Sequence, residues 1–131
     1  MLIINLREKN MKIAVTATGN NLDAQVDPRF GRAHYFIIVD SDTLQFKVIE
    51  NPSAAAGGGA GVQSAQLIAD EKAEYLLTGN CGPNAFKVFE AAGINVIVNV
   101  SGIIREAIKE FKDGVHKVSD KANVVSHHGK L

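Results

Sequence analysis

The sequence predicts one α/β domain, built on a mixed five-stranded sheet whose faces are covered by helices. Its 131 residues are enough for one hydrophobic core and too few for two. Hydrophobic residues make up 46% and charged residues 21%, which is typical of a globular protein. The expected elements follow the order β-β-β-α-β-α-β-α. The initial hairpin requires antiparallel strands, and the later alternation of strands and helices requires parallel strands joined by right-handed crossovers.

Three strands are predicted in the first half of the chain. Each is a short run rich in β-branched, aromatic or alternating apolar residues, bounded by turn-forming residues. The turn-forming residues 40–43 separate the second run from the third, so these two runs are expected to form a β-hairpin. A loop over 22–32, which contains Asp27, Pro28 and Gly31, is expected to be ordered. The predicted strands are Lys12–Ala17, 34–39 and 44–49.

Helices alternate with strands in the second half. Apolar residues recur at helical spacing in three segments, and two short apolar runs separate these segments. Pro83 is expected at the first position of the second helix and Gly93 at its C-terminal end. Ser101 is expected to cap the third helix, which ends at Gly114. The predicted helices are 62–72, 83–92 and 102–113, and the predicted strands are Tyr75–Leu77 and 94–100.

The two ends of the chain are expected to lie outside this domain. Residues 1–10 (MLIINLREKN) lack the basic leader and the small-residue cleavage site of a signal peptide. Since a strand-like run begins directly after Met11, we interpret 1–10 as an N-terminal extension or the product of a misplaced start codon. An added edge strand is the alternative. The domain then spans 11–118, with 115–118 as a short edge strand, and 119–131 is predicted to be a polar, frayed tail.

Charge and cysteine content exclude several classes of protein. Lys and Arg number 14 and Asp and Glu number 14, so the net charge is zero. This balance argues against a nucleic-acid-binding protein and against a basic membrane-surface protein. A single cysteine cannot form an intramolecular disulfide, and no apolar run approaches the roughly 20 residues that span a bilayer. We therefore expect a cytoplasmic protein that binds neither nucleic acid nor membranes.

The only cysteine, Cys81, stands between a predicted strand and a predicted helix. In sheets of this kind, ligands bind beyond the carboxyl ends of the parallel strands, beside helix N-termini. The positive end of a helix dipole favours the thiolate, which is the form that binds metals, and Gly79 and Gly82 let the backbone approach a ligand closely. The alternative is a small buried hydrophobic residue, as free cysteine commonly is. No local pattern supplies a base, so a cysteine hydrolase is not favoured.

The segment 27–34 is the second candidate, because it combines an acid, two arginines and a histidine. The forked donors of Arg29 and Arg32 suit an anionic ligand. The alternative is a loop held by a pair between Asp27 and an arginine, with His34 as an ordinary strand residue.

A tract of small residues over 53–61 (SAAAGGGAG) is the third candidate. Gly57, Gly58 and Gly59 precede a predicted helix and could form an anion cradle, although the tract matches neither the P-loop nor the dinucleotide-binding pattern. A flexible lid or hinge is the alternative. This tract is expected to converge with two other segments at the carboxyl ends of the strands. They are 18–32, which contains Arg29 and Arg32 and which we call the arginine loop, and 78–84, which we call the Cys81 turn.

The distribution of acidic residues argues against catalysis. A metal-dependent nuclease on such a sheet needs carboxylates from its central strand to hold two metal ions, and 12–18 supplies none. We interpret His127 and His128 as solvated residues rather than a metal site.

Taken together, four segments resemble the nitrogenase iron–molybdenum-cofactor biosynthesis family. They are 11–40, with its DPRFGRA block, the glycine tract, TGNCGPNAF (78–86) and AAGINVIV (91–98). The family includes NifX-like proteins, the C-terminal part of NifB and short stand-alone relatives. The resemblance covers most of 11–118 and implies a ribonuclease H-like fold. It also implies a non-enzymatic role in which iron–sulfur precursors or the finished cofactor are bound or carried, in some hosts for nitrogen fixation.

Matched position by position, the resemblance implies cluster-facing residues in the loop Arg29, Phe30, Gly31 and Arg32 and in the turn with Cys81 and Gly82. Many relatives carry a histidine in the small-residue tract, whereas Gly57, Gly58 and Gly59 stand here. Cys81 would then be the metal ligand, because a soft thiolate suits iron–sulfur centres, and the two arginines would offset the anionic cluster.

The function expected from these residues is that of a carrier or accessory factor for an iron–sulfur or iron–molybdenum-type cluster. Its partners would be cluster donor and acceptor proteins. One thiolate is far fewer than the four usual ligands of a stable cluster, so binding would be transient or shared between the subunits of a homodimer. The alternative is a small anion- or nucleotide-binding regulatory module on the same fold.

Overall fold

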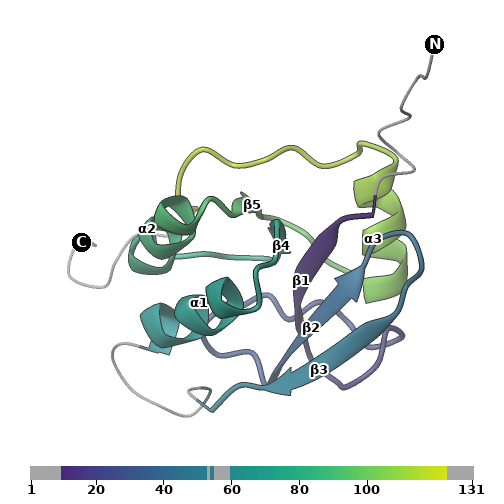
Figure 1. Cartoon of the computed structure of the whole chain (residues 1–131), viewed down its shortest axis with the longest axis horizontal. Coiled ribbons are helices and arrows are strands. Elements are labelled where there is room, and N and C mark those ends of the chain that lie inside the picture. Colours follow the sequence, from purple (N-terminus) through teal and green to yellow (C-terminus); the bar gives the residue numbers. More distant parts are fainter. Residues whose placement is uncertain (1–9, 53, 55–59, 124–131) are drawn as a thin grey trace.

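A computed structural model describes residues 10–52, 54 and 60–123 of the chain (Figure 1). Its elements follow the predicted order β-β-β-α-β-α-β-α. The longest helix has 11 residues, and within the described part of the chain no helix has the length and apolar character needed to cross a membrane. The strands are β1 (Lys12–Ala17), β2 (Tyr35–Asp40), β3 (Phe46–Glu50), β4 (Tyr75–Leu77) and β5 (Asn95–Ile97), and the helices are α1 (Ala60–Asp70), α2 (Pro83–Ala92) and α3 (Ile104–Lys112).

The strands form one mixed sheet in the order β3-β2-β1-β4-β5. β2 runs antiparallel to both β1 and β3, whereas β4 runs parallel to both β1 and β5. The predictions of a hairpin followed by parallel strands are therefore confirmed. Because β3, β1, β4 and β5 all point the same way, their C-terminal ends lie along one side of the sheet, which we call the carboxyl edge.

Helices cover both faces of the sheet, as the sequence predicts. In Figure 1, α1 and α2 lie together on one face and α3 lies on the other. Each face has its own buried hydrophobic cluster, and successive residues of β1 alternate between them: Ala14 points toward α1 and α2, and Val15 points toward α3. The more specific assignment to a ribonuclease H-like fold stays a prediction.

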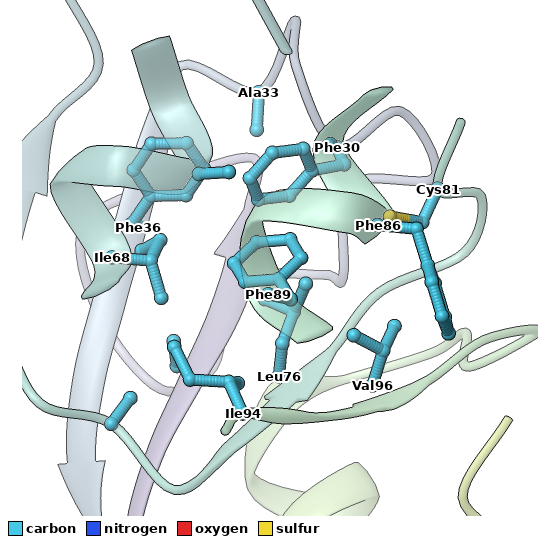
Figure 2. Packing of buried hydrophobic residues seen from close by; sticks show 14 of the residues in the cluster. Phe30, Ala33, Phe36, Ile68, Leu76, Cys81, Phe86, Phe89, Ile94 and Val96 are labelled. Atoms are coloured by element: carbon cyan, nitrogen blue, oxygen red, sulfur yellow. The ribbon is translucent and has the colours of Figure 1, made fainter. Parts of the chain in front are cut away.

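Three phenylalanines form the centre of the cluster beneath α1 and α2. Phe36 comes from β2, Phe89 comes from α2, and Phe30 comes from the loop between β1 and β2 (Figure 2). The ring of Phe30 stacks on that of Phe36 at a centroid distance of 5.5 Å and meets the edge of Phe89 at 5.1 Å. Such aromatic pairs add to the free energy gained by burial alone. The arginine loop is thus anchored in the core by its own central residue.

The start of α3 differs from the prediction. Ser101 does not cap this helix, because its N-cap residue is Ile103, which makes no side-chain capping bond. Instead, the N–H groups of Ile104 and Arg105 donate to the carbonyl oxygens of Ala24 and Leu22, both at 2.9 Å. A neighbouring loop therefore satisfies the orphan donors that a serine was expected to satisfy.

The segment after α3 also differs from the prediction. Residues 115–118 form no strand. Of the predicted tail 119–131, only 119–123 belong to the described residues, and these make hydrogen bonds to the domain. The N–H of Ser119 donates to the carbonyl oxygen of Val96 at 2.7 Å, and Asn123 contacts the turn after β4. These residues are held by hydrogen bonds to distant parts of the chain, which a polar composition does not reveal.

Replacing Phe30 should destabilise the protein strongly even though the residue lies in a loop. Phe30→Ala removes a ring packed between two others, and we expect a loss of about 3–5 kcal/mol in the free energy of unfolding. Phe30→Leu keeps much of the volume and should cost less than about half of that. Urea unfolding of both variants, monitored by circular dichroism, measures the difference. Equal stability of Phe30→Ala and the wild type would contradict the anchoring role.

Candidate functional site

Two of the three candidate segments lie side by side at the carboxyl edge. Arg29 and Asn80 form a parallel bridge between the arginine loop and the turn after β4. The N–H of Asn80 donates to the carbonyl oxygen of Pro28 at 2.7 Å, and the N–H of Phe30 donates to that of Asn80 at 3.3 Å. The predicted convergence is confirmed for these two segments. Of the third segment, 53–61, the residues Gly57, Gly58 and Gly59 lie outside the described residues.

This contact requires a glycine at position 79. A Cβ atom on Gly79 would lie 2.6 Å from the Cα and 2.8 Å from the carbonyl oxygen of Pro28, closer than real Cβ contacts. The two backbones can therefore meet only because Gly79 has no side chain. The glycine fixes the distance between the arginine loop and the turn.

Buried hydroxyl groups support the site from below. The side chains of Thr16, in β1, and Thr78, just after β4, are both buried and lie 2.9 Å apart between their Oγ1 atoms. Thr16 also donates to the carbonyl oxygen of Asp27 at 2.7 Å. These bonds tie the ends of two parallel strands to the start of the arginine loop.

The arginine loop presents two cationic groups to solvent. The carboxylate of Asp27 is buried, accepts a hydrogen bond from the backbone N–H of Arg29 at 3.0 Å and lies 3.7 Å from its Nε. The side chain of Arg29 nevertheless remains 63% exposed. Arg32 is exposed, and no carboxylate in the described part of the chain pairs with it. The predicted Asp27–arginine pair exists, but it leaves both guanidinium groups accessible.

Asn51 fastens the other end of this loop. Its Nδ2 donates to the carbonyl oxygens of Ala33 at 2.9 Å and Gly31 at 3.2 Å, and its Oδ1 accepts from the hydroxyl of Ser64 in α1 at 3.1 Å. The carbonyl of Gly31 is therefore turned toward the protein. The sequence does not single out Asn51, because an Asn-Pro pair is typical of a chain that leaves a strand and says nothing of the distant carbonyl groups that the side chain binds.

His34 is not the ordinary strand residue that the alternative interpretation of this segment expected. It is exposed and precedes β2 instead of lying within it. Its carbonyl oxygen accepts a hydrogen bond from the backbone N–H of Asn51 at 2.9 Å. The residue thus contributes to the loop through its backbone.

The N-terminal turns of α1 and α2 are in contact at the same edge. A Cβ on Gly61 would lie 3.7 Å from the Cβ of Ala85, an ordinary packing distance. Helix α2 begins after Gly82 with Pro83 at its first turn and has no side-chain cap. Each N-terminus carries partial positive charge, so two helix ends add to the field of Arg29 and Arg32.

Cys81 does not face this site. Its side chain is completely buried in the cluster beneath α1 and α2, and Figure 2 shows it among the labelled residues of that cluster. Its Sγ lies 3.7 Å from the carbonyl oxygen of Gly82. Burial raises the pKa of the thiol from 9.0 to about 12. The prediction of an open thiolate is therefore wrong for this structure.

The physical reason is a competition between two effects at Cys81. The dipole of α2 favours a thiolate by at most about 2 kcal/mol in partly buried settings. Removing that charge from water costs more when apolar side chains surround the sulfur, so the neutral thiol prevails. Phe30 is corrected in the same way, because its ring lies in the core instead of facing a ligand.

The described residues contain no cluster of three or more histidine, cysteine, aspartate or glutamate side chains arranged to hold a metal ion. The donors at the carboxyl edge are guanidinium groups and backbone N–H groups. Donors of this kind suit an anionic ligand, which they can hold by charge and hydrogen bonds, and the described residues at this edge offer no set of soft metal ligands beside them.

Comparisons with known proteins agree with this architecture. A family model described as dinitrogenase iron-molybdenum cofactor matches residues 11–114. An uncharacterised protein of Methanocaldococcus jannaschii is 37% identical over 112 residues, which cover 83% of this chain and 92% of the relative.

Two solved structures are similar to this chain, with sequence identities close to that of the M. jannaschii relative. The apo form of the orange protein from Desulfovibrio gigas is 40% identical with a TM-score of 0.84, and the match covers 89% of this chain and 99% of that one. A proposed NifB protein from Thermotoga is 36% identical with a TM-score of 0.71, over 82% of this chain and 92% of that one.

The contact at Gly79 can be tested by adding one methyl group. Gly79→Ala forces the turn away from Pro28 and should lower the free energy of unfolding by about 2–3 kcal/mol. Gly61→Ala is the matched control, because its Cβ meets only ordinary contacts and alanine favours helix. Urea unfolding compares the two. A Gly79→Ala protein as stable as Gly61→Ala would show that the close approach is not required.

The buried thiol should make stability depend on pH. Above pH 9 the unfolded chain releases the Cys81 proton, whereas the folded protein retains it up to a pKa of about 12. The free energy of unfolding should therefore fall as the pH rises, by about 1.4 kcal/mol between about pH 8 and about pH 10.

Cys81→Ala has no thiol and provides the reference for this experiment. Urea unfolding at the two pH values should show the extra loss in the wild type, since other titrating groups affect both proteins alike. An identical change in both proteins would mean that the Cys81 thiol ionises as easily in the fold as in water.

Proposed function

Because the chain belongs to the dinitrogenase iron-molybdenum cofactor family, we propose that it binds an anionic iron–sulfur or iron–molybdenum-type cluster at the carboxyl edge. The observation that carries the proposal is the placement of two exposed guanidinium groups, from Arg29 and Arg32, at the edge where α1 and α2 begin. The cluster is cargo that the protein holds and hands on without converting it.

The donors at this edge fit a cluster that brings its own sulfides. Such a cluster carries net negative charge and presents sulfur atoms that accept hydrogen bonds. Guanidinium groups suit that surface, and so do the N–H groups of the first turn of α2 that follow Pro83, which has no N–H of its own. Cys81 supplies no bond to metal in this conformation, because it is buried and protonated. Holding a cluster without covalent ligation also suits a carrier, which must release what it binds.

The similar proteins support this assignment. The orange protein was solved in an apo form, a term that implies a second form with a bound group. The Thermotoga relative is described as a proposed NifB protein. We propose that cluster donor and acceptor proteins are the partners, in the cytoplasm, and that a homodimer sharing one cluster is an available assembly.

A second candidate function uses the same residues. Helix N-termini and arginines also bind phosphate groups, so the carboxyl edge could serve a nucleotide- or anion-binding regulatory module. The contact between the first turns of α1 and α2 is the observation that favours it. Calorimetry with inorganic phosphate and with ATP, in metal-free buffer, separates the two functions. Saturable binding there, without any uptake of iron and sulfide, would support the regulatory module.

Removing the two exposed charges should impair cluster binding. The double variant Arg29→Gln, Arg32→Gln should take up at least about tenfold less cluster than the wild type, because each guanidinium contributes a charge-assisted interaction. The measurement is anaerobic reconstitution with ferrous iron, sulfide and molybdate, followed by the visible charge-transfer absorption and by metal analysis of the gel-filtered protein.

Two control variants sharpen the test. Arg105→Gln removes an exposed arginine that pairs with Asp23 beside α3, and it should leave uptake unchanged. Cys81→Ala should also retain uptake if charge and not thiolate ligation holds the cluster. Equal uptake by the wild type and the double arginine variant would refute binding at this edge, and loss of uptake in Cys81→Ala would return the thiol to the site.

A further inference from the structure

The residues that follow α3 return to the candidate site. We call residues 115–123 the strap. In Figure 1 the strap runs from α3 past β5 toward α2. Its Ser119 donates from the backbone N–H to the carbonyl oxygen of Val96 at 2.7 Å. Because β5 is the last strand of the sheet, this bond lies on its outer side, and the strap reaches the carboxyl edge from there.

One residue of the strap, Asn123, forms hydrogen bonds with each residue from Gly79 to Cys81 in the turn after β4. Its Oδ1 accepts from the backbone N–H of Cys81 at 2.7 Å, and its Nδ2 donates to the carbonyl oxygen of Gly79 and to Oδ1 of Asn80, both at 3.1 Å. Its own backbone N–H donates to the carbonyl oxygen of Cys81 at 3.1 Å. Every residue from Gly79 to Cys81 is therefore bound by a residue more than 40 positions away.

Polar contacts hold the strap more than apolar burial does. Its two valines face outward, since Val115 is 62% and Val118 is 50% exposed. Ala122 packs against the cluster that contains Cys81, and it is small and only half-buried. A segment held mainly by hydrogen bonds at its end opens more easily than a core element, because little apolar area must be exposed.

We propose that the strap is a releasable cover for the Gly79–Cys81 turn and that Asn123 is the positioning residue that keeps it closed. In the closed state Asn123 sets the shape of the turn that meets the arginine loop, and Ala122 helps to seal Cys81 from solvent. Release of the strap frees the backbone of Cys81 and opens a path to its sulfur, while the sheet and the three helices stay folded.

A releasable strap has a consequence for the site that rests on the proposed function. The closed protein offers only charge and hydrogen bonds to a cluster, whereas the open protein also offers a soft sulfur beside the same edge. Strap release would therefore add a ligand of a different chemical kind. The strap itself does not depend on this consequence and can be tested without any cluster.

The test measures the accessibility of the single thiol in the full chain. The wild type and Asn123→Ala are treated with N-ethylmaleimide at one fixed pH, without metal, and modification of Cys81 is followed by mass spectrometry. Asn123→Ala should react about tenfold faster or more, since it loses the three side-chain hydrogen bonds that close the turn. A chain that ends at Val118 should react at least as fast, and a chain that ends at Asn123 should react at the wild-type rate.

The urea dependence of the reaction separates release of the strap from global unfolding. Local opening exposes little surface, so at low urea the rate in Asn123→Ala should barely change with denaturant. Ile108→Ala, in the opposite hydrophobic cluster, is the control that destabilises the fold without touching the strap. Its reaction should rise steeply with urea, in parallel with its unfolding.

Two results would overturn the proposal. One is a wild-type reaction rate in Asn123→Ala, which would mean that the strap does not control access. The other is an accelerated rate that follows urea as steeply as in Ile108→Ala, because the residue would then act only on global stability. Neither result bears on cluster uptake by the arginine variants, so the two proposals fail separately.

Discussion

The close approach of two backbones at the carboxyl edge is the constraint on which the site depends. Gly79 lies against Pro28 at a distance that leaves no room for a side chain, and hydrogen bonds between Pro28, Phe30 and Asn80 hold the two segments together. The core locks the same contact, because Phe30 inserts its ring between Phe36 and Phe89. The exposed arginines on either side of Phe30 thus stand on a loop that cannot move without disturbing the hydrophobic core.

The order and type of the elements could be predicted because each depends on local chemistry. Turn residues marked the hairpin, and Gly93 closes α2 in the left-handed conformation (φ 75°) that its position suggested. The contact between the arginine loop and the Cys81 turn could be predicted from topology. One segment follows β1 and the other follows β4, and these parallel neighbours end at the same edge of the sheet. Features that depend on hydrophobic periodicity and on turn-forming residues can therefore be predicted from the sequence.

The interactions that the sequence did not disclose join residues far apart in the chain. Asn51 and Asn123 each satisfy several backbone groups, yet one looked like a strand terminator and the other like part of a polar tail. The expected Ser101 cap is wrong for a similar reason. The N–H groups at the start of α3 donate to carbonyl oxygens of a loop that is distant in the sequence. At Cys81 the sequence placed the residue correctly but could not show which way its side chain points, and burial reversed its expected chemistry. A glycine-flanked cysteine at a helix start is thus a weak indicator of a reactive thiol.

The bond between Ser119 and Val96 has a consequence beyond the site. A sheet that ends in an unpaired strand offers a row of free backbone groups, onto which a strand of a neighbouring molecule can add. Here the chain lays its own backbone against that margin. One short segment therefore both occupies a backbone group of the outermost strand and contacts the turn after β4, so a change that loosens it leaves that carbonyl open to a strand of a second molecule.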